Sequence, residues 1–301
     1  MLVAEIARLK KQRDAVILAH TYQPGPVQDC ADYVGDSYGL SVEATKTHAS
    51  VIIFCGVRFM AETAAILNPS RPVILPEPLA GCPMADMIIP EELIALKNEH
   101  PDHLVMCYVN STAEIKALSD VCCTSSNAVK IAKRLPADRG IIFVPDRHLG
   151  SFVQEQTGRD MILWDGFCPT HLRLQPPMLE AARSTHPGAK LLIHPEADRE
   201  CRVLADAVLS TGGMLDYVKN DGGTEYIIAT ENGLIHTLRK ANPGKRFYEV
   251  SDEVVCPNMK RGNLSSLRAA LEGTGGERVM VEPAVAAKAI KSLEMMLELS
   301  K

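Results

Sequence analysis

Three cysteine-proline steps recur along the chain at nearly equal spacing. Of nine cysteines, only Cys82, Cys168 and Cys256 precede proline, at separations of 86 and 88 residues in a chain of 301. Three thiolates that converge from separate segments suit a metal ion or an iron–sulfur cluster. Zinc is an alternative, but structural zinc cysteines usually come as C-x-x-C pairs, which these three lack. Three ligands on a four-iron cluster would leave one iron open for Lewis-acid chemistry.

Other polar residues repeat with the same period. Each third of the chain has a polar residue at the end of an apolar run, another polar residue two positions on, and a hydroxyl 17 positions after the first. In chain order these are His20, Tyr22 and Ser37; Tyr108, Asn110 and Ser125; and His194, Glu196 and Thr211. Histidine, tyrosine and glutamate can transfer protons, and hydroxyls at a helix start can bind anions. The recurrence of these positions in one order predicts a threefold internal repeat.

The apolar runs that must position these residues predict an α/β fold. The expected strands are 15–19, 51–54 and 73–75; 104–107, 141–144 and 161–164; and 190–193, 226–228 and 246–250. Helical segments between them make each third a strand, helix, strand, helix, strand unit with its polar anchors at strand C-terminal ends, where parallel sheets bind ligands. We expect three αβα repeats with short parallel sheets around one central cavity, at 1–87, 88–174 and 175–262. Helices in 263–301 are expected to pack back on these units.

Composition and charge favour a small-molecule partner. The net charge is −5 and no dense basic cluster occurs, which argues against nucleic-acid binding. Residues 1–13 have the spacing of an amphipathic helix rather than a signal peptide, and no apolar stretch is long enough to span a membrane. We therefore expect a cytoplasmic protein with nine reduced cysteines. The remaining six, Cys30, Cys55, Cys107, Cys122, Cys123 and Cys201, are expected to be structural thiols.

Two further polar residues have no counterpart in the repeat. His148 is expected to be a loop or capping residue rather than a ligand. Lys219 lies in the helix after the glycine-rich step at 211–213, where a solvated position is favoured over a contact with an anionic ligand.

The motifs around these positions together resemble the quinolinate synthase family, the A protein of NAD biosynthesis. The resemblance covers nearly the whole chain. It rests on His20-Thr-Tyr22-Gln, Gly35-Asp-Ser37, Gly81-Cys82-Pro83-Met84-Ala85, Tyr108-Val-Asn110, Cys123-Thr-Ser125, Cys168-Pro-Thr-His171, His194-Pro-Glu196, Thr211-Gly-Gly213-Met214 and Cys256-Pro. Some members carry a C-x-x-C-x-x-C run at the third cysteine, whereas Cys256 stands alone, so a thiol–disulfide switch built on that run is not expected.

The resemblance implies three pseudo-threefold-related domains and a [4Fe–4S] cluster held by Cys82, Cys168 and Cys256. It further implies condensation of iminoaspartate with dihydroxyacetone phosphate to quinolinate, with loss of phosphate and two waters. L-aspartate oxidase or aspartate dehydrogenase would supply the iminoaspartate.

Site roles carried over from the family form two overlapping sets. Tyr22 and Glu196 are the expected proton-transfer residues, together with His20 and the cavity-lining His171. Contacts to substrate are expected from His20, Ser37, Tyr108, Asn110, Ser125, His194, Glu196 and Thr211.

Two other classes of protein could use three cysteines in this way. A diphthamide-type enzyme would cleave S-adenosylmethionine to make radicals, and the cavity rich in histidine, tyrosine and glutamate argues against that reaction. A metal-storing or electron-carrying protein would need neither Tyr22 nor Glu196.

Overall fold

Nearly continuous apolar runs form the central strands of three separate parallel sheets. The computed structural model describes residues 2–301. Every residue of β3 (Val51–Cys55) and β7 (Ile141–Val144) is buried, as expected for strands covered on both faces. In β1 (Ala15–His20), Val16 and Leu18 pack into one apolar cluster, whereas Ile17 and Ala19 pack into another. The first sheet is therefore the middle layer of a three-layer unit.

Each of the three units alternates helices and strands along the chain. The first contains α1 (Leu2–Gln12), β1, α2 (Gly25–Cys30), β2 (Tyr33–Gly35), α3 (Ser37–Lys46), β3, α4 (Arg58–Leu67), β4 (Val73–Leu75) and the 3₁₀ turn η1 (Pro83–Asp86). The second contains α5 (Pro90–Glu99), β5 (Leu104–Tyr108), α6 (Ala113–Ala117), β6 (Val121–Cys123), α7 (Ala128–Arg134), β7, α8 (Arg147–Thr157), β8 (Met161–Leu163) and η2 (His171–Arg173). The third contains α9 (Pro176–Thr185), β9 (Lys190–Ile193), α10 (Arg199–Arg202), β10 (Ala207–Val208), α11 (Thr211–Asn220), β11 (Glu225–Ala229), α12 (Leu234–Ala241) and β12 (Arg246–Glu249).

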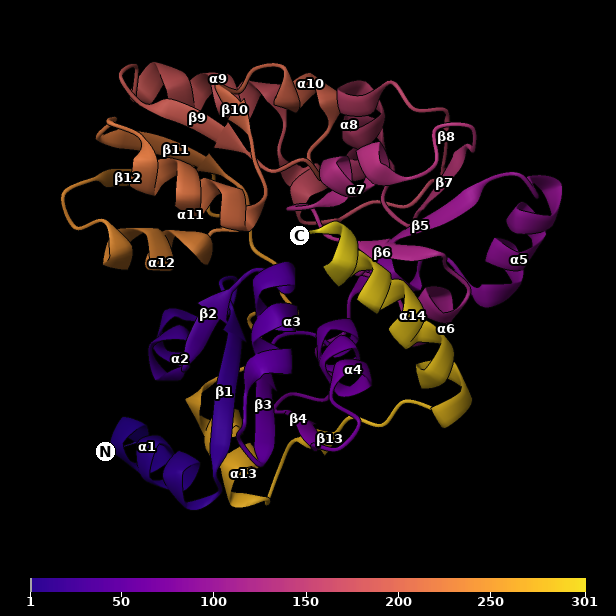
Figure 1. The fold of residues 1–301 in the computed structure, drawn as a ribbon. Helices are drawn as coiled ribbons and strands as arrows, with labels where there is room; N and C mark the ends of the chain where they lie inside the picture. Colours follow the sequence, from indigo (N-terminus) through magenta and orange to yellow (C-terminus); the bar gives the residue numbers. More distant parts are fainter. Residues whose placement is uncertain (1) are drawn as a thin grey trace.

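The three sheets share one strand order. They run β4-β3-β1-β2, β8-β7-β5-β6 and β12-β11-β9-β10, with all of these neighbours parallel. Figure 1 shows the three units around a common centre. The predicted α/β class and threefold arrangement are confirmed, whereas the unit boundaries at residues 87, 174 and 262 stay predictions.

The sequence pattern missed one strand in every unit. The expected order of strand, helix, strand, helix, strand is wrong because β2, β6 and β10 add a short edge strand after the first. These strands have only two or three residues, and Tyr33 and Ala207 begin them at incompletely buried positions. Such short edge strands have no apolar run long enough to be recognised.

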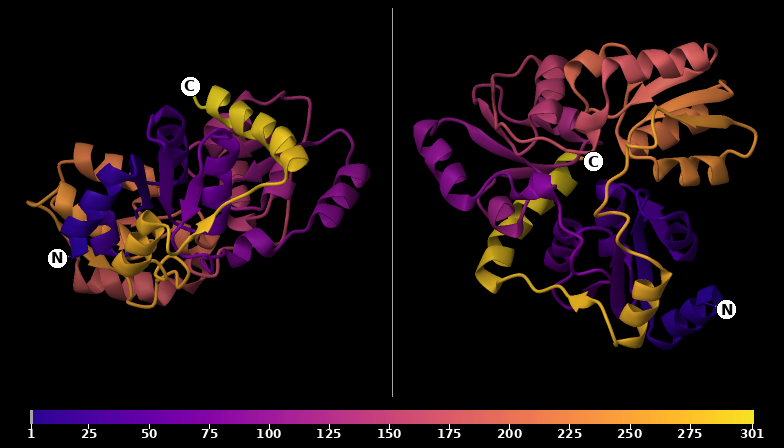
Figure 2. Two further views of the ribbon diagram at one scale, coloured as in Figure 1. Left: turned by 90° about the horizontal axis from the view of Figure 1, so that it is seen from below. Right: turned by 180° about the vertical axis from the view of Figure 1, so that it is seen from behind.

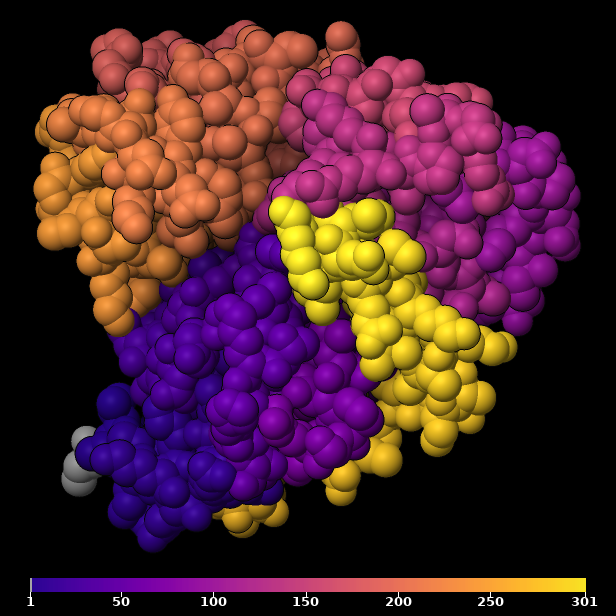
Figure 3. All heavy atoms as spheres, in the orientation of Figure 1, coloured from indigo at the N-terminus to yellow at the C-terminus, as the bar shows by residue number. Residues whose placement is uncertain are grey.

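The C-terminal segment contacts two of the units. α13 (Leu264–Glu272) packs on α1 and β3, and β13 (Glu277–Arg278) pairs antiparallel with β4. α14 (Pro283–Leu299) then crosses to the second unit and packs on α6 and β6 with a buried stripe of Ala289, Ser292, Leu293 and Met296. The two views of Figure 2 follow this crossing, and Figure 3 shows the segment along the boundary between the first and second units.

No helix within residues 2–301 has the length and apolar character required to span a membrane.

Candidate functional site

The predicted polar anchors lie at the carboxyl edges of the three sheets. His20 and Tyr108 are the last residues of β1 and β5, and His194 directly follows β9. Each of these central strands ends beside the second long strand of its own sheet, through the pairs Ala19 with Cys55, Cys107 with Val144, and Ile193 with Ala229. Because carboxyl edges of parallel strands are where loops present ligand-binding groups, three such edges create one site.

One cavity collects every predicted site residue. Its volume is about 140 Å³. Its walls include Cys82, Cys168, Cys256, His20, Tyr22, Ser37, Tyr108, Asn110, Ser125, His171, His194, Glu196 and Thr211. Among residues 2–301 no other cysteine lines it, and five of the remaining six are buried elsewhere, Cys30 being partly exposed.

The loops that carry the three cysteines are anchored in the same way in each unit. In every case a backbone N–H just after the second long strand donates to the carbonyl two residues before the cysteine. These bonds are Arg58 to Ala80 at 2.8 Å, Arg147 to Gly166 at 2.9 Å and Asn232 to Val254 at 3.0 Å. The threefold repeat thus extends to the backbone that positions each sulfur.

The three cysteines share an electrostatic environment. Burial raises the pKa of Cys82 to about 12 and also raises the pKa values of Cys168 and Cys256. In each case the backbone N–H three residues on, from Ala85, His171 or Met259, opposes this effect. Partly buried thiols with the same N–H partner in each of three units are a donor set that fits an iron–sulfur cluster with three protein ligands.

A chain of hydrogen bonds runs through the cavity wall beside Cys168. The Tyr22 hydroxyl lies 2.7 Å from Thr230 Oγ1, which lies 2.8 Å from His171 Nε2. His171 Nδ1 in turn lies 2.8 Å from Glu196 Oε2, and the Tyr108 hydroxyl donates to Glu196 Oε1. A carboxylate only accepts, so Nδ1 carries a proton, and in the uncharged form of the ring Nε2 accepts from Thr230. The chain therefore links two tyrosines through one histidine and one carboxylate.

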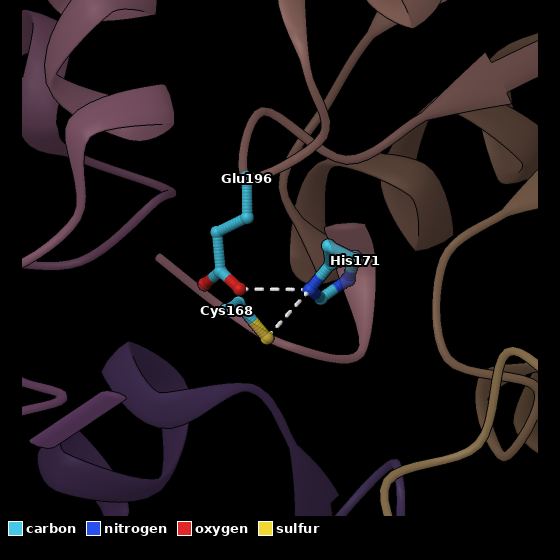
Figure 4. A group of neighbouring side chains, drawn as sticks. All are labelled: Cys168, His171 and Glu196. Carbon is cyan, nitrogen blue, oxygen red and sulfur yellow. Dashed lines mark hydrogen bonds and ion pairs between the residues drawn. The ribbon is translucent and has the colours of Figure 1, made fainter. Parts of the chain in front are cut away.

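Cys168, His171 and Glu196 also form a compact set of possible metal-binding atoms. Their ligand atoms all lie within 4.8 Å of one another, and Figure 4 shows His171 Nδ1 facing both the Glu196 carboxylate and the Cys168 sulfur. That nitrogen lies 3.2 Å from Cys168 Sγ as well as beside Glu196. Because Nδ1 already donates its proton to the carboxylate, the arrangement favours a hydrogen-bonded triad over a single-ion site.

Two histidines are fixed as neutral donors. The backbone N–H of Tyr22 donates to His20 Nδ1 at 3.1 Å, and that of Glu196 donates to His194 Nδ1 at 3.3 Å. Burial lowers the pKa of both rings to about 3. Each neutral ring therefore has its proton on Nε2, which is available to donate to a ligand oxygen.

The site shifts the pKa values of its carboxylate and of its two tyrosines in opposite directions. Burial alone would raise the pKa of Glu196, but the adjacent His171, which donates a hydrogen bond to it, and the Tyr108 hydroxyl outweigh burial and lower that pKa. Burial and the charge of Glu196 raise the pKa values of Tyr22 and Tyr108 well above the usual range. The site thus combines an ionised carboxylate with protonated phenols, the separation expected of acid–base groups.

Helix starts and uncharged polar groups line the rest of the cavity. Ser37 and Thr211 are the first residues of α3 and α11, each preceded by a capping residue, Asp36 or Ser210. Ser125 lies in the turn before α7. Asn110 Oδ1 is buried and makes no hydrogen bond within residues 2–301. Free N–H groups and hydroxyls at these starts suit carboxylates or phosphates.

Sequence reasoning missed three buried polar residues near the site, and it placed two others correctly away from it. Thr230 and Glu231 follow β11 and Asp146 follows β7, all fully buried, so the strand-end argument used for His20 would have found them. His148 does not line the cavity, as expected, but it lies in the first turn of α8, where Asp146 is the cap, and not in a loop or at the cap itself. Lys219 is exposed in the last turn of α11.

Comparison with known proteins gives consistent matches over nearly the whole chain. Residues 4–298 match the family model described as Quinolinate synthetase A protein. The chain is 51% identical over 293 residues to quinolinate synthase of Dehalococcoides mccartyi strain CBDB1, covering 97% of this chain and 96% of that one. It is 48% identical over 297 residues to quinolinate synthase of Caldicellulosiruptor saccharolyticus, covering 98% of this chain and 97% of the relative.

Proposed function

Because the chain belongs to the quinolinate synthetase A protein family, we propose that it makes quinolinate from iminoaspartate and dihydroxyacetone phosphate. The observation that carries this proposal is the joint lining of one cavity by three cysteines and by the Tyr22–Thr230–His171–Glu196 chain. The reaction balances without an oxidant: the two substrates together have the atoms of quinolinate, one phosphate and two waters. It therefore needs acids, bases and anion sites rather than a redox partner.

Cys82, Cys168 and Cys256 are the residues that would hold a [4Fe–4S] cluster. Their convergence from three units and their shared backbone anchoring support this assignment. When bound, such a cluster with one open iron supplies Lewis-acid polarisation of a substrate oxygen or nitrogen. Zinc is the competing occupant, and metal analysis separates the two.

Tyr22 is the proposed proton-transfer residue. Its raised pKa keeps the hydroxyl protonated at rest, so it needs a base in the step in which it loses a proton. Thr230 can pass that proton to His171 Nε2, and the neighbouring Glu196 carboxylate stabilises the imidazolium that results. The reverse transfer returns the proton to a departing hydroxyl as water. Tyr108, which is bonded to the other oxygen of Glu196, holds that carboxylate in place.

The remaining polar groups would bind the anionic parts of the substrates. Ser37, Ser125 and Thr211 offer hydroxyls beside helix starts, which suits two carboxylates and one phosphate. His20 and His194 would donate from Nε2, and Asn110 has a free buried amide oxygen. L-aspartate oxidase or aspartate dehydrogenase would supply the unstable iminoaspartate. We place the reaction in the cytoplasm, since nine free cysteines suit a reducing compartment.

The test is an anaerobic assay of iron-loaded protein. Wild type should form quinolinate from the two substrates, while Tyr22→Phe should keep its iron and lose turnover. A metal-storing or electron-carrying protein would tolerate Tyr22→Phe without any functional loss. Radical products that require S-adenosylmethionine would instead indicate a diphthamide-type reaction.

A further inference from the structure

Glu231 is a fully buried carboxylate that contacts the third cysteine loop. It directly follows Thr230, so adjacent residues contact the Tyr22 hydroxyl and the loop of Cys256. Glu231 Oε1 accepts the backbone N–H of Cys256 at 3.0 Å, and Oε2 accepts that of Gly233 at 2.7 Å. Its side chain is 0% exposed. Such a charge is stable in the interior only with a close partner of opposite sign.

Lys260 is that partner, and it also reaches the first unit. Its Nζ lies 2.7 Å from Glu231 Oε1 and 3.0 Å from Oε2. The same ammonium donates to the backbone carbonyl of Tyr22. One ion pair therefore joins the Cys256 loop, the end of β11 and the backbone of the proposed proton-transfer residue.

The packing around this pair leaves little freedom. A Cβ added at Gly233 would lie 2.7 Å from Lys260 Nζ and 2.8 Å from both Glu231 Oε2 and the Cα of Tyr22. Gln23 makes a second contact between the Tyr22 segment and the Cys256 loop, since its Nε2 donates to the carbonyl of Met259 at 2.8 Å. Only glycine fits at the junction without displacing the ion pair or the Tyr22 backbone.

We propose that Glu231 and Lys260 are positioning residues that set the separation between Cys256 and Tyr22. Thr230 fixes the hydroxyl of Tyr22, Lys260 fixes its backbone, and Glu231 fixes the N–H of Cys256. This inference rests on the proposed function, because the separation between Cys256 and Tyr22 matters for catalysis only if one reaction uses both residues. The geometric part, that the pair restrains the Cys256 loop, can be tested in protein without iron.

The first experiment measures thiol alkylation in iron-free protein. Iodoacetamide labelling of Cys256 and Cys82 is followed by mass spectrometry in wild type, Lys260→Met and Lys260→Arg. We expect iodoacetamide to label Cys256 about fivefold faster in Lys260→Met than in wild type. Without the ion pair, the loop that carries Cys256 should open about five times more often. Cys82, anchored in another unit, should label at the wild-type rate, and Lys260→Arg should behave like wild type.

Lys240→Met is the matched control. Lys240 pairs with Asp29 at 2.6 Å and joins the same two units, but it is 66% exposed and contacts neither Cys256 nor Tyr22. If Lys260→Met unfolds because it leaves Glu231 unpaired, the double variant Glu231→Gln/Lys260→Met removes both charges and takes its place. Faster labelling of Cys256 in Lys240→Met as well, or an unchanged rate in the Lys260 variants, would overturn the proposal.

The second experiment tests the link to catalysis in iron-loaded protein. Lys260→Met should lower kcat by roughly 10²-fold, the cost of misplacing a reacting group by about 1 Å, and leave KM unchanged. It should also release iron to a chelator faster than wild type. A wild-type kcat in a variant with faster Cys256 labelling would refute the catalytic part alone. Absence of quinolinate from wild type would refute the proposed function and leave the labelling result standing.

Discussion

Replacing Thr230 by valine tests whether protons pass along the Tyr22–Thr230–His171–Glu196 chain. Valine keeps the shape of the side chain and removes the one hydroxyl that contacts both Tyr22 Oη, at 2.7 Å, and His171 Nε2, at 2.8 Å. Tyr22 keeps its second partner, because its hydroxyl also lies 2.8 Å from Thr211 Oγ1. The substitution therefore interrupts proton transfer while Tyr22 stays in place.

The expected loss of turnover follows from the contribution that general acid–base catalysis makes to reaction rates. Such a group contributes about 10²- to 10⁴-fold, so kcat should fall by that range. KM should change little, because Thr230 is fully buried behind the residues that line the cavity. The buried Nε2 of His171 loses its partner, which should lower the free energy of unfolding by about 1–3 kcal/mol.

The assay is anaerobic steady-state turnover combined with urea unfolding and iron analysis of each variant. Thr230→Ser is the control, since it keeps the hydroxyl and should retain most of the activity. If Thr230→Val turns over like wild type while holding the same iron content, proton transfer does not pass through Thr230 and the relay is wrong.

Three further predictions concern other parts of the site. Tyr22→Phe should lower kcat by about 10²- to 10⁴-fold at unchanged iron content, and full activity would exclude Tyr22 as the proton-transfer residue. Ser125→Ala should raise KM by about 10- to 100-fold, the value of a hydrogen bond to a charged group, with kcat changed less; an unchanged KM would remove Ser125 from the anion site. Burial lowers the pKa values of His20 and His194 to about 3. Between about pH 6.5 and 3 these histidines therefore bind protons in the unfolded chain but not in the folded protein. Urea unfolding of iron-free protein should therefore show stability falling between pH 6.5 and 3, by up to about 1.4 kcal/mol per pH unit for each histidine. Exposed His48→Gln should leave this slope unchanged, whereas a flat profile in wild type would show that the two rings are protonated in the folded state.

The repeat made most of the cavity wall predictable from sequence. His20, Tyr108 and His194 end apolar runs at equal spacing, and parallel strands bring such ends together. The three Cys-Pro steps follow the same period. A repeated unit fixes position without any knowledge of individual contacts, so the residues that obey it are predicted to share one cavity wall, where the structure places them.

Residues outside the repeat were not predictable in this way. Thr230 has Gly56 and Pro145 at the equivalent places after β3 and β7, so no recurrence drew attention to it. His171 is expected from the motif to line the cavity and to take part in proton transfer, but its bonds to Thr230 and Glu196 depend on how the third unit meets the second. Lys260 sits in an irregular loop, and only the folded chain places it beside Glu231 and Tyr22.

We propose that the three cysteines and the Tyr22–Thr230–His171–Glu196 chain serve one reaction. The most direct measurement is iron and sulfide content of protein purified without oxygen, followed by assay of quinolinate from iminoaspartate and dihydroxyacetone phosphate, with Cys168→Ser in parallel. We predict about four irons and four sulfides per chain and quinolinate from wild type, with both lost in Cys168→Ser. A colourless, zinc-loaded wild type without product, or a Cys168→Ser variant with full cluster content and activity, would contradict it.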